Sequence, residues 1–112
     1  MKMNDEISPF KALDFIRDNA QAYAEAKANV IYMTEYRKSL KSLLMSECLA
    51  ETQTAKEAWA YAHPKYVLHL EALKTAVAEA EKLRWLMIAA EAKIEVWRSL
   101  ESTARAEGRS TT

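Results

Sequence analysis

Three basic residues in the first half of the chain have the types and spacing to bind phosphate groups. Arg37, Lys38 and Lys41 lie within residues 36–46, a stretch that contains no acidic residue. On a helix they fall within one arc of about 100°, with Ser42 beside them as a further hydrogen-bond donor to phosphate. Such contacts hold a nucleic-acid backbone without reading its bases. The alternative is that these residues form an ordinary solvated flank of a helix.

Residue types that usually carry catalysis or bind metals are sparse and poorly spaced. His63 and His69 are six residues apart and do not share a helix face, and no Glu-x-x-His or His-x-x-x-His pair is present. Cys48 has no histidine near it in sequence, and Gly108 is the only glycine, so no glycine-rich loop can bind phosphate. We therefore expect His63 to have a structural role at a helix end. We expect no enzymatic activity, no metal and no cofactor.

The composition predicts one soluble, all-helical domain over residues 1–112, because the chain has one glycine, two prolines and abundant alanine, glutamate, lysine and leucine. Sixteen basic residues balance sixteen acidic ones, so electrostatic recognition must come from local clusters. The lone Cys48 indicates a reducing compartment. Residues 1–10 lack the apolar core of a signal peptide, and the longest apolar run, Leu86–Ala90, is too short to span a membrane. We expect a cytoplasmic protein with no membrane partner.

A first long helix is predicted from Ser8-Pro9, an N-cap followed by proline, to about Cys48 or Glu51. A break is expected near residues 52–54. The apolar residues that recur at helical spacing and predict the buried face are Leu13, Ile16, Ala20, Tyr23, Val30, Met33, Leu40 and Leu44.

A short helix and a second long helix are predicted to follow. Thr54 and Glu57 have capping-box spacing, which predicts a helix over about residues 55–62, with Trp59 and Tyr61 filling the bend. His63-Pro64 then starts a helix over residues 65–107 that ends at a Gly108 cap. The resulting fold is all-α: a long antiparallel helical hairpin of coiled-coil type with a short helical elbow. Residues 1–7 and 109–112 are expected to be disordered.

The second long helix carries apolar residues on two nearly opposite faces. One face contains Leu83, Leu86, Met87, Ala90, Ile94 and Trp97. The other contains Trp85, Ala89, Ala92 and Val96. A hairpin partner covers only one face, and an exposed apolar second face is unusual in a monomer, so we expect the second face to join subunits of a homo-oligomer. The alternative is that the short helix folds over it. Further upstream, a third apolar stripe points about 100° away from the first face and contains Leu70, Leu73, Val77 and Ala80. Such a step predicts that the helix contacts different partners along its length.

Several segments resemble small all-helical proteins from phage early regions, in a layout similar to UvsY-like recombination mediators. They are Tyr36-Arg37-Lys38-Ser39, Ala60-Tyr61-Ala62-His63-Pro64-x-Tyr66, Leu83-Arg84-Trp85 and Lys93-Ile94-Glu95-x-Trp97-Arg98-Ser99. The resemblance covers about residues 20–102. It implies a ring-like homo-oligomer that binds single-stranded DNA and helps to load a recombinase where single-strand-binding protein sits. It implies no catalytic residues, and it implies the cytoplasm of a host cell.

Two functional hypotheses follow. In the first, the protein is a recombination accessory factor in which Arg37, Lys38 and Lys41 contact phosphates, with Arg84 as a further candidate. In the second, it is a protein-interaction module, such as a phage regulator or a blocker of a host factor, that binds protein through the face containing Trp85 and binds no nucleic acid.

Overall fold

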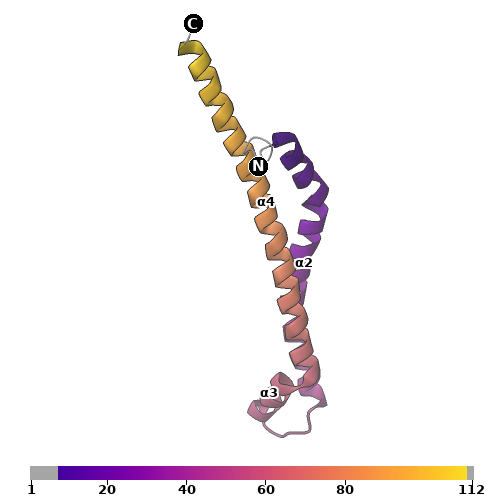
Figure 1. Ribbon diagram of the computed structural model, residues 1–112. Helices are drawn as coiled ribbons and strands as arrows, with labels where there is room; N and C mark the ends of the chain where they lie inside the picture. Colours follow the sequence, from indigo (N-terminus) through magenta and orange to yellow (C-terminus); the bar gives the residue numbers. More distant parts are fainter. Residues whose placement is uncertain (1–7, 111–112) are drawn as a thin grey trace. The chain divides into compact units, whose positions relative to one another are not determined.

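Three helices contain 93% of the residues in a computed structural model that describes residues 8–110, and no strand occurs in that range. They are α2 over Pro9–Glu47, α3 over Gln53–Ala62 and α4 over Pro64–Ser110 (Figure 1). This confirms an all-helical chain in which a short helix separates two long ones. The expected disorder of residues 1–7 lies outside the described residues, as does that of 111 and 112. Residues 109 and 110 are helical, so the expectation is wrong for these two.

Thr52, rather than Thr54, caps the start of α3. The Thr52 hydroxyl accepts a hydrogen bond from the amide of Ala55 at 3.1 Å, and its carbonyl accepts one from the amide of Lys56 at 3.1 Å. The capping box predicted at Thr54 and Glu57 is therefore wrong. Both threonines have the type that caps a helix, but the earlier start leaves Glu57 free to reach Lys41, with an Nζ–Oε1 distance of 3.4 Å.

His63 ends α3 and begins α4, as the sequence predicted. Its amide donates to the carbonyl of Ala60 at 3.2 Å, and its Nδ1 accepts a hydrogen bond from the amide of Lys65 at 3.0 Å. The imidazole also packs edge-on against the ring of Trp59, with 5.0 Å between centroids. His63 thus satisfies backbone groups at two helix ends.

The predicted cap at Gly108 is wrong, because α4 continues through this residue to Ser110. Gly108 does not adopt the positive φ that a glycine cap requires. A Cβ at this position would meet nothing within 4 Å. Glycine permits a left-handed cap without enforcing it, and here helical backbone bonds continue instead.

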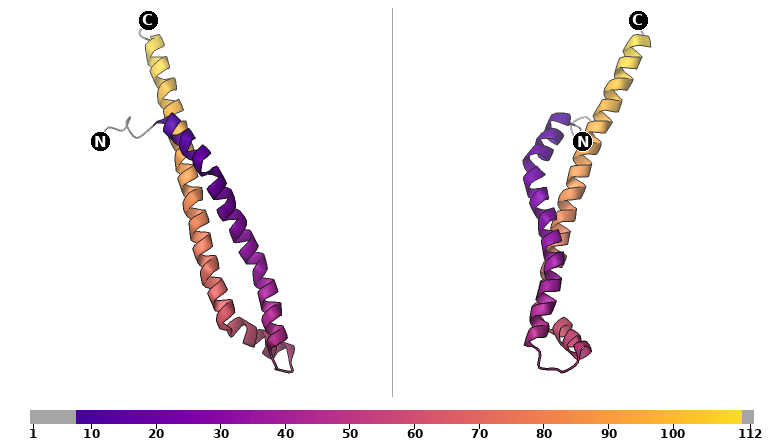
Figure 2. Two further views of the ribbon diagram at one scale, coloured as in Figure 1. Left: turned by 90° about the vertical axis from the view of Figure 1, so that its right-hand side faces the viewer. Right: turned by 180° about the vertical axis from the view of Figure 1, so that it is seen from behind.

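The helices form two compact units. Among the described residues, unit 1 contains residues 8–23 and 82–110, and unit 2 contains residues 24–81. In each unit a segment of α2 lies beside a segment of α4 that runs in the opposite direction, and unit 2 also contains α3 (Figure 2). This is the antiparallel pairing expected of a hairpin with a helical elbow.

The core of unit 2 lies where α3 meets the two long helices. It consists of Leu40, Leu44, Ala60 and Tyr66, with Met45 packed against it. Leu44 is 1% exposed and Ala60 is fully buried. Trp59 and Tyr61 were expected to fill the bend, but both remain exposed. The small side chain of Ala60 faces inward instead, and this allows α3 to approach the core closely.

Apart from Arg84, the buried and half-buried positions of α4 alternate in steps of three and four residues. They are Tyr66, His69, Leu73, Ala76, Ala80, Leu83, Met87, Ala90 and Ile94. This spacing is the heptad pattern of a coiled coil, which lags a straight α-helix by about 20° per heptad. The two predicted stripes are centred about two heptads apart, so this lag accounts for about 40° of the offset between them. Leu70 and Val77 of the upstream stripe are exposed. The inference of different partners along α4 remains a prediction.

The buried face of α2 differs from the prediction at two positions in unit 1. Leu13 and Ala20 are exposed, whereas Ala12 is buried and Asn19 is half-buried. Asn19 is tolerated because its amide donates to the carbonyl of Phe15 at 2.9 Å, which satisfies the polar group within its own helix. The other residues of the predicted α2 stripe are buried or half-buried: Ile16, Tyr23, Val30, Met33, Leu40 and Leu44.

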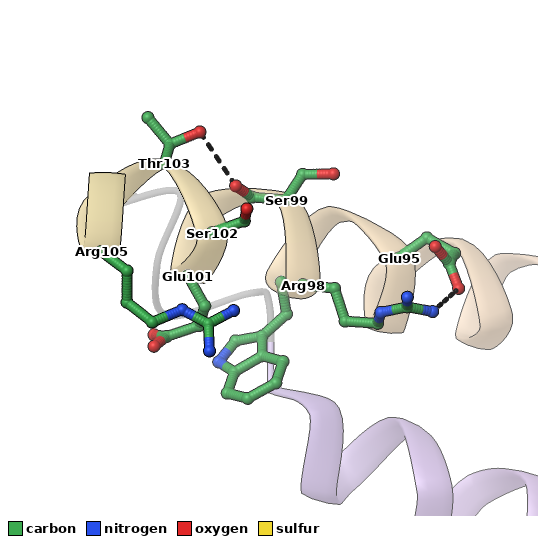
Figure 3. A pocket seen from close by; sticks show the side chains of 8 residues that line it. Glu95, Arg98, Ser99, Glu101, Ser102, Thr103 and Arg105 are labelled. Carbon is green, nitrogen blue, oxygen red and sulfur yellow. Dashed lines mark hydrogen bonds and ion pairs between the residues drawn. The ribbon is translucent and has the colours of Figure 1, made fainter. Parts of the chain in front are cut away.

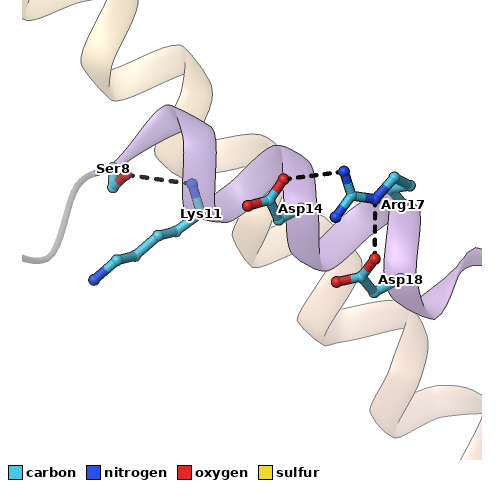
Figure 4. Close-up of polar contacts among 5 residues, drawn as sticks. All are labelled: Ser8, Lys11, Asp14, Arg17 and Asp18. Atoms are coloured by element: carbon cyan, nitrogen blue, oxygen red, sulfur yellow. Dashed lines mark hydrogen bonds and ion pairs between the residues drawn. The ribbon is translucent and has the colours of Figure 1, made fainter.

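Local polar contacts form near both ends of unit 1. On α4, Arg98 pairs with Glu95 at 3.0 Å, and the Thr103 hydroxyl donates to the carbonyl of Ser99 at 3.0 Å (Figure 3). At the start of α2, the Ser8 hydroxyl accepts from the amide of Lys11 at 3.3 Å, which confirms the predicted N-cap (Figure 4).

Candidate nucleic-acid interface

The three predicted phosphate-binding residues lie together on one groove of unit 2. The groove is an open cavity of about 540 Å³ formed by α2, α3 and the start of α4. Its lining residues are Arg37, Lys38, Lys41, Ser42, Met45, Gln53, Glu57, Tyr61 and Tyr66. Ser42, which the sequence placed beside the cations, is among them. We call this cavity the basic groove.

Lys41 is the most constrained of the three cations. Its Nζ lies 3.4 Å from Oε1 of Glu57 on α3 and 4.8 Å from the centroid of the Tyr61 ring. The Lys41 side chain is 27% exposed and that of Glu57 is 42% exposed. The Tyr61 side chain is the main cause of a raised pKa for the Lys41 ammonium, and the charge of Glu57 adds to it. Lys41 is therefore charged at neutral pH.

Lys38 and Arg37 differ in how they are held. Lys38 Nζ lies 3.1 Å from Oε2 of Glu35, and both side chains are mostly exposed. Exposed pairs one helical turn apart are worth only a few tenths of a kcal/mol, so Lys38 can exchange this partner for another anion. Arg37 is half-buried and forms no ion pair with any described residue. Of the three groove cations, Arg37 therefore has no carboxylate partner among residues 8–110, whereas Lys38 and Lys41 each have one.

The surroundings of the groove are less basic than the sequence of residues 36–46 indicates. Glu35 precedes that stretch by one residue and pairs with Lys38. Glu57 comes from α3, sixteen residues beyond Lys41. Two of the three cations therefore have anionic neighbours. An incoming phosphate must compete with these carboxylates.

Tyr61 is a groove residue that the sequence analysis did not assign to the site. Its ring is half exposed, packs edge-on against Tyr66 with 5.2 Å between centroids, and lies beside the Lys41 ammonium. An exposed aromatic ring beside cations is the arrangement on which single-stranded bases stack. No local sequence signal links residue 61 to residues 37–41, because the turn at residues 48–52 and the packing of Ala60 create the proximity.

Arg84, the fourth predicted phosphate-binding residue, does not line the basic groove. It belongs to unit 1, whereas all residues of the groove belong to unit 2. Its guanidinium lies over the ring of Trp85, with Cζ 4.8 Å from the ring centroid. This cation–π contact stabilises the exposed face of α4.

The residues expected at a subunit contact all lie at the surface of unit 1. Trp85 is 59% exposed and Val96 is 43% exposed, and Ala89 and Ala92 are exposed as well. The assignment of this face to an oligomer remains a prediction. Coverage of this face by α3, the alternative to self-association, likewise remains a prediction.

Histidine and cysteine side chains have packing roles in the described structure. Nε2 of His69 lies 2.7 Å from the carbonyl oxygen of Met33, and its ring tilts against Tyr36. Cys48 is half-buried and unpaired. Within residues 8–110, no three His, Cys, Asp or Glu side chains gather in a way that could hold a metal ion.

Comparison with known proteins does not assign this chain to a family. No family model, curated protein or solved structure matches it. Among the described helices, none is both long and apolar enough to cross a membrane. The geometry of the basic groove and of the α4 surface is therefore the basis for a functional proposal.

Proposed function

We propose that this protein is a non-enzymatic recombination accessory factor that binds single-stranded DNA as a homo-oligomer. The observation that carries the proposal is the basic groove, where three cations of α2 lie together beside an exposed tyrosine of α3. The resemblance to UvsY-like mediators supports the same function. Its partners would be a recombinase and a single-strand-binding protein, acting in the cytoplasm of a host cell.

In this mechanism the groove binds the DNA backbone and leaves the bases unread. Arg37 provides a cation that has no carboxylate partner among the described residues, and Lys38 and Lys41 exchange their carboxylate partners for phosphate oxygens. Tyr61 offers a ring for stacking, which tolerates any base. Repetition of the groove around an oligomer would extend a short binding site into a track along the strand. Arg84 would contribute through the surface of unit 1.

The test is binding of a fluorescent single-stranded oligonucleotide across a range of salt concentrations. Each phosphate contact releases condensed counterions, so the logarithm of affinity should fall linearly with the logarithm of salt, by about 0.7 per contact. The triple variant Arg37→Glu, Lys38→Glu, Lys41→Glu should flatten this slope and weaken binding to all sequences equally.

A matched triple variant, Lys74→Glu, Lys82→Glu, Lys93→Glu, reverses the same charge on exposed positions of α4 outside the groove. It should retain much more affinity than the groove variant. Equal losses in the two variants would mean that net charge, rather than the groove, governs binding. Absence of wild-type binding at low salt would exclude the proposed function.

A second candidate function is protein binding without nucleic acid, and the surface of unit 1 favours it. In unit 1, an apolar hollow of about 250 Å³ lies between α2 and α4. It is lined by Ser8, Lys11, Ala12, Phe15, Leu86, Ala89, Ala90 and Lys93. If the wild type fails to bind DNA, a host or phage protein docked on this surface becomes the better proposal.

A further inference from the structure

We infer that Glu57 is an internal competitor for the DNA backbone: its carboxylate occupies Lys41, and a phosphate must displace it to bind there. The inference rests on the proposed function and assigns a regulatory role to a residue of the same groove. Glu57 is the acidic residue among those that line the basic groove. It comes from α3, whereas the cations come from α2.

The geometry places Glu57 where a phosphate would bind. Its Oε1 lies 3.4 Å from Lys41 Nζ, a distance at which a phosphate oxygen would also pair with the ammonium. Tyr61 also occupies space around the ammonium, with its ring centroid 4.8 Å from Nζ. A phosphate oxygen and the Glu57 carboxylate would therefore seek the same donor.

The exposure of the pair makes the exchange feasible. The Glu57 side chain is 42% exposed, so water can solvate its carboxylate once Lys41 turns to a phosphate. An ion pair this exposed contributes little net free energy, and its loss does not leave a buried charge. Glu57 therefore weakens DNA binding without preventing it.

The exchange also changes a link between helices in unit 2. The Lys41–Glu57 bond joins the side chains of α2 and α3, while Ala60 anchors α3 in the core independently. A bound phosphate would release this bond and leave the apolar anchor in place. DNA binding is thus coupled to the loss of the Lys41–Glu57 bond between α2 and α3. A mutation that breaks this bond should therefore raise the affinity for DNA.

The test is a double-mutant cycle on the full-length protein with Glu57→Gln and Lys41→Gln, measured by binding of a fluorescent poly-thymidine oligonucleotide. Glu57→Gln should raise affinity about fivefold while Lys41 is present. In the Lys41→Gln background the gain should be less than about twofold, because the competed cation is gone.

Glu71→Gln is the charge-matched control, on an exposed position of α4 in the same unit and outside the groove. Its affinity should stay within about twofold of the wild type. Equal gains from Glu57→Gln in both backgrounds, or equal gains from Glu57→Gln and Glu71→Gln, would overturn the inference and leave the DNA-binding proposal intact. If neither the wild type nor Glu57→Gln binds the oligonucleotide at low salt, both the inference about Glu57 and the DNA-binding proposal are wrong. Circular dichroism of each variant verifies that helix content is unchanged.

Discussion

Nε2 of His69 on α4 lies 2.7 Å from the backbone carbonyl oxygen of Met33 on α2. A carbonyl only accepts hydrogen bonds, so Nε2 carries the proton and donates it. Both residues occupy positions of the heptad pattern, where side chains of the two helices interdigitate. A polar group at such a position favours one alignment of two helices over others. The bond therefore helps to fix the register of α2 against α4 in unit 2.

Replacing this histidine should destabilise unit 2. His69→Ala removes the hydrogen bond and part of the packing against Tyr36, so the free energy of unfolding should fall by about 1–2 kcal/mol. Urea denaturation followed by circular dichroism measures the change. Leu68→Ala, at the exposed neighbouring position, should change it by less than about 0.5 kcal/mol. Similar losses in the two variants would contradict a structural role for the bond.

The N-cap of α3 provides a second test of stability. Thr52→Ala removes the hydroxyl that accepts from the amide of Ala55, and loss of an N-cap costs about 1 kcal/mol. Thr54→Ala changes an exposed position inside α3 and should be neutral or slightly stabilising, because alanine has the higher helix propensity. Thermal unfolding of the two variants distinguishes the cap at Thr52 from the alternative at Thr54.

The elements were predictable because strong local signals mark them. Ser8-Pro9 and His63-Pro64 begin α2 and α4 as expected, since a cap and a proline act within a few residues of each other. The end of α4 was less predictable. Gly108 permits a cap but does not impose one, and α4 extends past it. Composition therefore determined the types of element more firmly than their ends.

The site was predictable only within one helix. Helical spacing brought Arg37, Lys38 and Lys41 to one face, and the basic groove contains all three. The contribution of α3 was not predictable, because Glu57 and Tyr61 reach the groove through the turn and the packing of Ala60. The predicted stripes also assumed 3.6 residues per turn, whereas buried positions of α4 recur every 3.5 residues on average. Such a heptad pattern drifts steadily around the helix, so part of the predicted buried face was misplaced.

The raised pKa of Lys41 predicts a loss of stability at high pH. Tyr61, and then Glu57, favour the charged ammonium and raise its pKa above 10.5 in the folded protein. The stability that Lys41 contributes is therefore fully present below pH 10.5 and is lost as pH rises through the raised pKa. The difference in unfolding free energy between the wild type and Lys41→Met should be constant from pH 7 to about pH 9.5 and shrink above pH 10.5. A difference that grows with pH would contradict this assignment.

The exposed face of α4 predicts self-association through Trp85. Trp85 is 59% exposed in the single chain, so Trp85→Glu should leave helix content unchanged. In an oligomer the same substitution would bury an unpaired carboxylate, which costs several kcal/mol. Light scattering should therefore show a lower mass for Trp85→Glu than for the wild type. Leu13→Glu, at an exposed apolar position of α2, is the matched control and should keep the wild-type mass. A wild-type protein that is monomeric at high micromolar concentration would show that this face does not join subunits.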